Sequence, residues 1–353
     1  MMNEICVGLI GYGMAARTFH VPVIQSVPQL SLKKVVARHR DPSLDRYPSV
    51  EVLPDTAALL QDESIDLVVI ATPNRSHFDL ASQALLANKH VVVEKPFTTS
   101  SAQAQQLIEL ARQQNRLVSV HHNRRWDGDF QTVKQLLSNN LLGRLVEYEA
   151  HYDRFRNFPR PNAWREAAGE GSGILFDLGS HLIDQAQVLF GLPQRVTADL
   201  RTQRDFAQAV DNFDLTLHYD GLKVILKGGM LVRGPEPHFI LHGTAGSFIK
   251  YGMDPQEEAL KLGLTPTDPG WGEEPRERWG TLNTQINGLH VEGQVETLAG
   301  SYQAYYQNIA EAIAGRAELE VKPEEARDTI RIIELAMQSN AQNCTLPLLA
   351  RSL

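Results

Sequence analysis

Two glycines placed directly after a short apolar run constrain the fold of this chain more than any other feature. The run Ile5–Ile10 is apolar on both faces, which is typical of a strand buried in a parallel sheet. Gly11 and Gly13 follow it and precede a stretch that can be helical. In such a strand–turn–helix unit, the first glycine permits the tight turn and the second lets the backbone approach a pyrophosphate. A plain glycine turn in a parallel sheet is the alternative that this motif alone leaves open.

The rest of the first third of the chain alternates between strand and helix patterns. Helices are predicted at Ser76–Ala87, capped by Asn74, and at Ala102–Gln114, capped by Ser100. Strands that alternate with helices predict right-handed crossovers and a doubly wound parallel sheet of the Rossmann type. The predicted strands are Ile5–Ile10, Leu32–Ala37, Leu67–Ala71, Val91–Val93 and Leu117–Val120.

The pattern changes near His121, where a helix at Trp126–Asn139 is predicted to lead into longer alternating segments. These indicate an antiparallel sheet with one covered face. Residues 254–300 show no clear period and are expected to form a long surface excursion, followed by helices at Tyr302–Ala314 and Glu324–Gln342. The alternating segments are Arg144–Asp153, Val196–Thr202, Phe213–Tyr219, Val224–Met230, His238–His242 and Ser247–Tyr251.

The chain of 353 residues is long enough for two domains. We predict an α/β dinucleotide-binding domain over residues 1–122 and an α+β domain over residues 123–353. The second domain is expected to bind the substrate.

The composition narrows the class of protein. A formal net charge of −8 disfavours a nucleic-acid binder, which normally carries a basic stripe. Two distant cysteines, Cys6 and Cys344, make neither a disulfide framework nor a zinc motif. The first residues lack the features of a signal peptide, and no apolar run approaches the ~18 residues that span a bilayer. We expect a soluble cytoplasmic protein that binds neither nucleic acid nor membrane.

The end of the second predicted strand bears on the choice of nicotinamide cofactor. A carboxylate there would bind the ribose 2′-hydroxyl of NAD, but none occurs before Asp41. Arg38 stands close to the expected position, and a guanidinium can hold a 2′-phosphate through two parallel bonds. These residues favour NADP and leave NAD possible. The alternative is that Arg38, His39 and Arg40 are solvated loop cations.

Two further turns end strands at the edge of the predicted sheet where ligands bind in open α/β folds. Thr72, Pro73 and Asn74 form the first turn, and Thr72 and Asn74 can line the cofactor, although Asn74 can also be only a helix cap. Glu94 and Lys95 begin the second turn. The Lys95 ammonium can polarise a substrate carbonyl or stabilise a developing alkoxide. The alternative is a lysine that only pairs with Glu94.

A histidine between two aspartates is a candidate for acid–base chemistry. His181 lies four residues after Asp177 and three before Asp184, so a helix would place all three on one face. A carboxylate can fix the orientation of the imidazole, and histidine is suited to proton exchange near neutral pH. The alternative is a histidine at a helix start that an aspartate cap satisfies.

Two further segments are expected to line the cleft between the domains. Asn123 lies in the first, and Trp164 with Arg165 forms the second, for which an exposed loop with a stacked Arg–Trp pair is the alternative. Adjacent His121 and His122 point different ways and do not chelate, and no zinc motif occurs, so we predict no metal.

Four motifs, taken in their order and separation, resemble the glucose–fructose oxidoreductase / inositol dehydrogenase / rhizopine-catabolism family, called Gfo/Idh/MocA. The likeness covers nearly the whole chain. Asn123–Asp127 and Ser247–Gly252 are similar to the branch that contains NADP-dependent scyllo-inositol dehydrogenases, although Arg38–Arg40 is more basic than many members are there. The motifs are Gly11-Tyr12-Gly13, Thr72-Pro73-Asn74 with His77, Glu94-Lys95-Pro96 and Asp177-Leu178-Gly179-Ser180-His181-Leu182-Ile183-Asp184.

The resemblance implies a Rossmann domain followed by an α+β domain with a large, mostly antiparallel sheet. That sheet commonly pairs subunits, so a homodimer or homotetramer is expected. It also implies that Lys95, Asp177 and His181 are the catalytic groups. The expected cofactor-binding residues are Gly11, Gly13, Met14, Ala15, Arg38, Thr72, Pro73, Asn74, His77, Glu94, Lys95, Asn123, Trp164 and Arg165. The expected substrate-binding residues are Lys95, Tyr152, Arg154, Asp177 and His181.

The leading hypothesis is an NADP-dependent oxidoreductase that transfers a hydride between the nicotinamide and a secondary alcohol or ketone of a cyclic polyol or sugar, such as scyllo-inositol. His181 would take the hydroxyl proton, Lys95 would stabilise the oxygen, and Asp177 would orient His181. Two alternatives stay open: a dehydrogenase for aldoses or other sugars, with NAD or NADP, and a non-catalytic protein that senses NADP.

Overall fold

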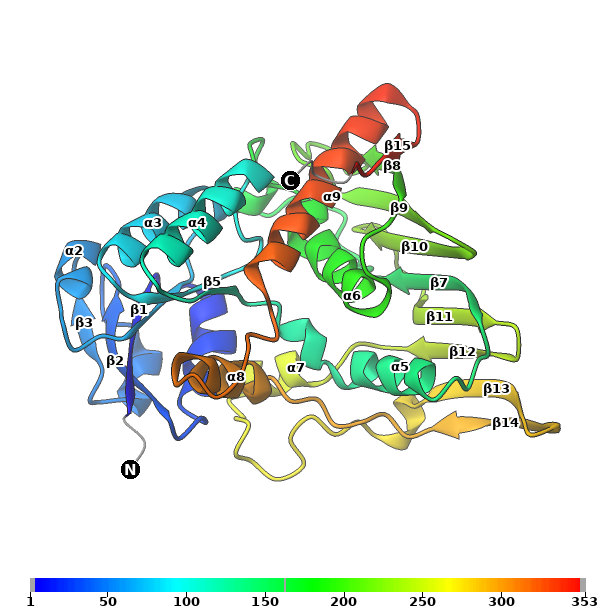
Figure 1. The fold of residues 1–353 in the computed structure, drawn as a ribbon, viewed down its shortest axis with the longest axis horizontal. Helices are drawn as coiled ribbons and strands as arrows, with labels where there is room; N and C mark the ends of the chain where they lie inside the picture. The colour runs from blue at the N-terminus through cyan, green and yellow to red at the C-terminus, as the bar shows by residue number, and fades with distance from the viewer. Residues whose placement is uncertain (1–3, 162, 350–353) are drawn as a thin grey trace. The chain divides into compact units, whose positions relative to one another are not determined.

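The computed structural model describes residues 4–161 and 163–349 of the chain. They form two compact units, each with its own sheet and its own apolar core (Figure 1). The first unit comprises the chain up to Trp126 together with Pro255–Gly272 and Ser301–Arg327. The second comprises Asp127–Asp254, Glu273–Gly300 and the chain from Asp328 onward.

A six-stranded sheet forms the centre of the first unit, and every neighbouring pair of its strands is parallel. The strand order is β3-β2-β1-β4-β5-β6, so the chain reverses direction across the sheet between β1 and β4, as in doubly wound folds. The predicted parallel sheet is confirmed. Its strands are β1 Ile5–Ile10, β2 Leu30–Val36, β3 Glu51–Leu53, β4 Leu67–Ile70, β5 His90–Val93 and β6 Val118–Val120.

The helices of the first unit cover the sheet and begin at recognisable caps. Ser100 accepts a hydrogen bond from the Gln103 N–H and caps α4, as predicted. The predicted cap of α3 is wrong, because Asn74 lies in a separate 3₁₀ turn and Ser76 occupies the N-cap position. A capping residue must directly precede its helix, so the extra turn places Asn74 too early. The helices are α1 Val21–Ile24, α2 Thr56–Leu60, α3 His77–Leu86, α4 Ser101–Gln113, α7 Gln256–Lys261 and α8 Gln303–Ile313.

The last two of these helices belong to segments that return to the first unit late in the sequence. Leu260 of α7 and Tyr305, Tyr306 and Ile309 of α8 are buried in the same core as β1, β4 and β5. The sequence-based division assigned residues 123–353 to one domain, whereas the structure places three pieces of that range in the first unit. Apolar periodicity reports that a helix has a buried face and does not report which core buries it.

The second unit is built on a nine-stranded, mostly antiparallel sheet, as predicted. Its strand order is β14-β13-β12-β11-β7-β10-β9-β8-β15, and β7 and β10 are its one parallel pair among the described residues. The strands are β7 Leu145–His151, β8 Arg195–Arg201, β9 Asn212–Tyr219, β10 Leu222–Gly229, β11 Pro237–Gly243, β12 Gly246–Tyr251, β13 Gly280–Ile286, β14 Leu289–Val295 and β15 Leu346–Pro347.

The range 254–300, predicted only as a long surface excursion, contains regular structure: α7 and the largely exposed β13–β14 hairpin. β13 buries only Gly280, Leu282 and Thr284 on its inner face, and β14 is exposed along nearly its whole length. One leucine among small and polar residues gives too weak an alternation to predict a strand. The pairing of β13 with β12 therefore depends on tertiary contacts.

Helices cover one face of the nine-stranded sheet (Figure 1). They are α5 Gly128–Ser138, α6 Ser180–Phe190 and the later part of α9 Pro323–Gln342. On β9, Phe213, Leu215 and Leu217 face this core, and the residues between them are only half-buried. The alternation agrees with the predicted sheet that is covered on one face.

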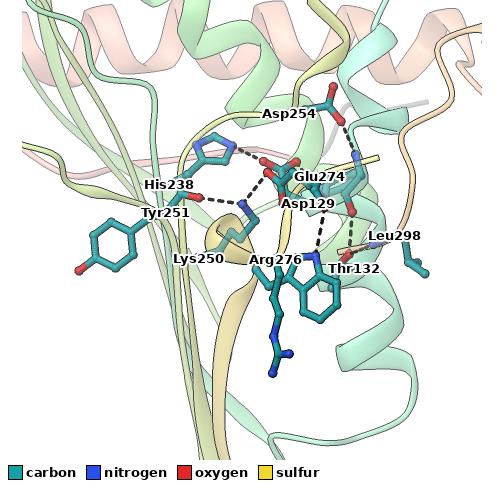
Figure 2. Close-up of polar contacts among 12 residues, drawn as sticks. Asp129, Thr132, His238, Lys250, Tyr251, Asp254, Glu274, Arg276 and Leu298 are labelled. Atoms are coloured by element: carbon teal, nitrogen blue, oxygen red, sulfur yellow. Dashed lines mark hydrogen bonds and ion pairs between the residues drawn. The ribbon is translucent and has the colours of Figure 1, made fainter. Parts of the chain in front are cut away.

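Charged side chains gather inside the second unit next to the first turn of α5 (Figure 2). Lys250 of β12 is almost fully buried and donates to Glu274 at 2.9 Å and to the Tyr251 carbonyl at 2.7 Å. Asp254 accepts the Gly128 N–H at 2.7 Å at the start of α5. Asp129 accepts its neighbour's N–H through Oδ1 at 2.7 Å, and its Oδ2 lies 3.6 Å from His238 Nε2. We call Asp129, Lys250, Asp254 and Glu274 the inner acidic cluster.

Candidate cofactor-binding and catalytic residues

The glycine turn after β1 has the geometry that dinucleotide binding requires. Gly11 has a φ of +91°, and a Cβ there would lie 2.8 Å from the Ala71 carbonyl oxygen, so only glycine fits. A Cβ at Gly13 would meet no atom within 4 Å, which leaves the backbone at this position open to a ligand. The helical stretch that begins at Met14 directs its first N–H groups toward the turn. Gly11, Gly13, Met14 and Ala15 therefore fit a bound diphosphate.

Arg38 and Arg40, at the end of β2, differ in the hydrogen bonds that they form. Arg40 donates to the carbonyls of Val50 at 2.8 Å and Leu44 at 3.0 Å, so it braces its own loop. Arg38 is exposed, and within residues 4–161 and 163–349 no hydrogen bond or ion pair involves it. The guanidinium of Arg38 is therefore available to an anionic ligand, whereas that of Arg40 is not.

The first carboxylate after β2 is already engaged. Asp41 forms an ion pair with Arg17 at 2.9 Å and accepts both the N–H and the hydroxyl of Ser43. These bonds, led by the one from the Ser43 N–H, lower the pKa of Asp41. The Ser43 hydroxyl also lies 2.8 Å from the Tyr12 hydroxyl, which ties this loop to the glycine turn.

The turns after β4 and β5 are joined by a buried histidine. His77 is fully buried, and its ring nitrogens lie 3.0 Å from the Thr72 carbonyl and 2.9 Å from the Pro96 carbonyl. Thr72 also accepts the Ser76 hydroxyl at 2.8 Å. Burial lowers the pKa of His77, which keeps the ring neutral. We expected His77 among the cofactor-binding residues, and its place beneath the two turns indicates that it holds them in position.

Lys95 lies two residues after the end of β5, and the residues on both sides of it fix its backbone. Its backbone N–H donates to the Glu94 carboxylate at 2.9 Å, and its peptide bond to Pro96 is cis. Glu94 is buried and turns its carboxylate into the first unit. A contribution of Glu94 to ligand binding would therefore be indirect, through Lys95.

The segment that follows β6 binds parts of the first unit that come from much later in the sequence. Arg124 donates to Glu257 of α7 at 2.5 Å, and Arg125 donates to Glu325 at 2.8 Å. Asn123 is buried beside them. An unpaired guanidinium buried in this position would cost several kcal/mol, so each of these arginines needs a partner of opposite charge. The adjacent arginines that the sequence shows are thus structural.

In the second unit, the histidine motif begins in a π-helical turn, Leu175–Gly179, that runs into α6. The segment is helical, as the hypothesis of a shared face required. The wider π turn rotates Asp177 relative to His181, because its hydrogen bonds span five residues instead of four. Asp177 keeps 25% of its side chain exposed and forms an ion pair with Arg165 at 3.3 Å, while His181 and Asp184 are buried.

Aromatic and cationic side chains surround this motif within the second unit. The Tyr152 ring stacks on the His181 ring at 6.4 Å between centroids, and the Arg154 guanidinium lies 5.2 Å from the Tyr152 ring. Arg165 lies over the Trp164 ring at 4.4 Å and also reaches Asp177. These contacts form two groups: Tyr152 links Arg154 to His181, and Arg165 links Trp164 to Asp177.

Comparison with known protein families agrees with both units. Residues 5–122 match the NAD-binding Rossmann fold of the Gfo/Idh/MocA oxidoreductase family, and residues 134–348 match the C-terminal alpha/beta domain of the same family. The chain belongs to this family. It is therefore an oxidoreductase with an NAD(P)-binding domain. No helix in the described part of the chain is long and apolar enough to cross a bilayer.

Full-length relatives and a solved structure give the same result. The oxidoreductase YdgJ of Escherichia coli is 44% identical, and the match covers 98% of this chain and 99% of that protein. The scyllo-inositol 2-dehydrogenase (NADP(+)) IolW of Bacillus subtilis is 39% identical over 98% of this chain and 97% of IolW. The structure of the oxidoreductase YvaA from Bacillus subtilis superimposes with a TM-score of 0.95 and covers 99% of both chains at 39% identity.

The sequence analysis missed one group of side chains altogether. His20, Glu94, His121 and Tyr306 come together in the first unit, and their ring and carboxylate atoms lie within hydrogen-bonding distance. The sequence separations are 74 residues between His20 and Glu94 and 286 between His20 and Tyr306. No local spacing rule connects residues so far apart, so the fold is needed to find them.

Proposed function

We propose that this protein is an NADP-dependent oxidoreductase that interconverts a secondary alcohol and a ketone of a cyclic polyol or sugar, with scyllo-inositol as the model substrate. One observation carries the proposal. Gly11, Thr72 and Lys95 follow β1, β4 and β5, three neighbouring strands, at the same edge of the sheet. A cation thereby lies at the edge where a dinucleotide binds in doubly wound folds.

The proposed roles follow from the chemistry of each side chain. When bound, the nicotinamide supplies or accepts the hydride of the substrate carbon. In the oxidation, His181 takes the hydroxyl proton, and the Lys95 ammonium stabilises the negative charge on the substrate oxygen. Asp177 and the stacked Tyr152 hold the imidazole in position, Arg154 donates to substrate hydroxyls, and Arg165 with Trp164 contacts the cofactor. In the reduction, His181 returns the proton to the new alkoxide.

NADP is favoured over NAD because Arg38 is exposed and accessible while the carboxylate of Asp41 is engaged. The name of the relative IolW specifies NADP(+), which supports the same choice. Replacement of Arg38 by alanine should raise the KM for NADP about tenfold or more and leave the KM for NAD nearly unchanged, because only the 2′-phosphate contact is lost. Equal effects on both cofactors would contradict this role for Arg38.

The substrate is tested by a direct assay. The purified protein is incubated with NADP or NAD and with a panel of inositols and aldoses, and the absorbance of the reduced nicotinamide is followed. The proposal predicts reduction of NADP with a cyclic polyol and a lower kcat/KM with NAD. Turnover of aldoses alone would show that the substrate is an aldose and not a cyclic polyol. Tight NADP binding without turnover of any substrate would favour a protein that senses NADP.

We further propose that the protein forms a homodimer or homotetramer through the nine-stranded sheet. The hairpin at the sheet edge supports this, because Leu289 and Val291 of β14 are 71% and 40% exposed. An unpaired, apolar edge strand is a typical site of association. Light scattering at several concentrations should give a mass of two or four chains, and a monomer at all concentrations would exclude this assembly.

A further inference from the structure

Two histidines from distant parts of the first unit contact one carboxylate oxygen, and a tyrosine contacts one of these histidines. Glu94 Oε1 lies 2.9 Å from His20 Nε2 and 3.0 Å from His121 Nδ1. His20 Nδ1 lies 2.5 Å from the Tyr306 hydroxyl. The other carboxylate oxygen, Oε2, accepts the Lys95 backbone N–H at 2.9 Å. His20, Glu94, His121 and Tyr306 are all buried, and we call them the Glu94 network.

The positions of the protons in this network follow from its geometry. A carboxylate only accepts hydrogen bonds, so His20 Nε2 and His121 Nδ1 must each carry a proton. Burial raises the pKa of Tyr306 well above its ordinary value, so the phenol keeps its proton and its hydroxyl shares a hydrogen bond with His20 Nδ1. Burial lowers the pKa of His121 to about 4, so His121 is a neutral Nδ1–H tautomer.

The charge of Glu94 follows from the same bonds. Burial alone would raise the pKa of this carboxyl, but the hydrogen bonds from His121 and His20 outweigh burial and hold it well below its ordinary value. At neutral pH the network thus contains the Glu94 carboxylate, the neutral His121 ring, the His20 ring with a proton on Nε2, and the Tyr306 phenol. Three N–H donors reach the two carboxylate oxygens, and all of them are fixed by the fold.

The network also connects two elements that matter for the proposed function. His20 ends the π-helical turn Ala16–His20 of the helix that begins at the glycine turn. Glu94 precedes Lys95, and Tyr306 comes from α8, which lies in the late segment Ser301–Arg327 of the first unit. The carboxylate therefore joins the helix that faces a bound diphosphate to the backbone of the lysine.

We propose that Glu94 is a positioning residue, whose carboxylate, held by His20, His121 and Tyr306, fixes the backbone of Lys95. The proposal rests on the proposed function, in which Lys95 acts on the substrate oxygen. The same three groups, His20, Glu94 and His121, also offer one ligand atom each to a metal ion, since these atoms lie within 4.8 Å of one another. A metal would require both imidazoles to release the protons that now bond to Glu94, so the two arrangements are mutually exclusive.

The first test needs no substrate. The full chain carries twelve histidines, and nitrogen-detected NMR of ¹⁵N-histidine-labelled protein reports the tautomer and charge of each ring. His20→Gln and His121→Gln variants assign the two signals. At pH 7 the network predicts a proton on Nε2 of His20 and a neutral Nδ1–H form for His121. A His20 ring without a proton on Nε2, a His121 ring without a proton on Nδ1, or an equimolar metal ion in the purified protein would overturn the proposal.

The second test measures positioning. In Glu94→Gln the amide group must face either the Lys95 N–H or the two imidazole N–H groups, so at least one donor loses its acceptor. We expect kcat to fall about tenfold or more, while the dissociation constant of NADPH changes less than about threefold. A kcat within about twofold of the parent protein would overturn the positioning role.

A matched pair of tyrosines separates the network from general packing effects. Tyr305 and Tyr306 are neighbours on α8, and both are fully buried, but the Tyr305 hydroxyl donates to Ser119 instead of the network. Tyr306→Phe should lower kcat about threefold or more and shift the Nδ1 signal of His20, and Tyr305→Phe should do neither. Equal losses in both variants would overturn the proposal. If the parent protein transfers no hydride to any substrate, the proposed function fails, and the NMR spectra still decide whether the network exists.

Discussion

The Glu94 network and the inner acidic cluster are both buried groups of charged residues, yet the pKa values of Glu94 and Asp129 are shifted in opposite directions. Hydrogen bonds from His121 and His20 lower the pKa of Glu94 despite burial. Asp129 receives one N–H donor, from its neighbour Phe130. Burial and the nearby Asp254 raise the pKa of Asp129 to about 7. Both carboxyls are buried, so the direction of each shift follows from the groups around it: N–H donors at Glu94 and a second carboxyl at Asp129.

The two groups also differ in how their charge is balanced. The inner acidic cluster has a formal cation, Lys250, whose ammonium pairs with Glu274 in a region closed to solvent. The Glu94 network stabilises its negative charge with N–H donors of two imidazoles and one backbone amide. A network of this kind keeps an oxygen available to orient the neighbouring Lys95, whereas a closed ion pair mainly stabilises the fold.

The largest expected effect comes from the cation of the inner acidic cluster. Lys250→Met leaves Glu274 and its acidic neighbours buried without a counter-ion, which should lower the free energy of unfolding by about 3–5 kcal/mol. Denaturant unfolding measures the change. Lys223→Met is the matched control, because that lysine pairs with Glu147 on the surface and is 50% exposed; its loss should stay within about 0.5 kcal/mol. A similar, small loss in both variants would mean that Lys250 does not balance the cluster.

An intermediate effect is expected for the carboxylate of the Glu94 network. Glu94→Gln should lower the free energy of unfolding at pH 8 by about 1.5–3 kcal/mol, because donors to a charged acceptor are left unsatisfied. The folded pKa of Glu94 lies below the unfolded value of 4.5, so its stabilisation is complete above pH 4.5 and is lost only as pH falls. The difference between variant and parent should therefore be constant from pH 6 to 8. A difference that varies across this range would contradict the assigned ionisation.

The same chemical change at Asp129 should have the opposite sign and the smallest effect. The folded pKa of about 7 exceeds the ordinary value of 3.8, so the folded state binds the extra proton between these values. Stability contributed by Asp129 is present at low pH and is lost as pH rises through 7. The Asp129→Asn variant does not show this loss. The difference in free energy of unfolding, variant minus parent, should therefore rise by roughly 1–3 kcal/mol from pH 5 to pH 8. Parallel stability profiles would contradict the raised pKa.

The sequence predicts most of the first sheet because its strands carry a strong local signal. β1, β4 and β5 are apolar on both faces and end at recognisable turns, so their positions follow from the residues alone. β3 was not predicted, because it has only three residues and begins at exposed Glu51. Asn74 was assigned to the wrong helix boundary because a 3₁₀ turn leaves no clear pattern in the sequence.

The candidate site shows the same division between local and distant information. Lys95, Asp177 and His181 lie in continuous motifs and could be proposed from the sequence. The bond between Asp177 and Arg165, and the stacking of Tyr152 on His181, depend on how distant segments meet. The Glu94 network depends on α8, whose return to the first unit has no signal in local periodicity.

In the proposed reaction, His181 transfers the proton and Lys95 stabilises the charge on the substrate oxygen during hydride transfer. The most direct test measures the turnover of a cyclic polyol with NADP by Lys95→Met and His181→Asn, together with the dissociation constant of NADPH for each variant and with Lys223→Met as the control. We expect both variants to lose turnover by about 10²-fold or more while they still bind NADPH, and the control to be unaffected. Turnover close to that of the parent protein in either variant would exclude the proposed role of that residue.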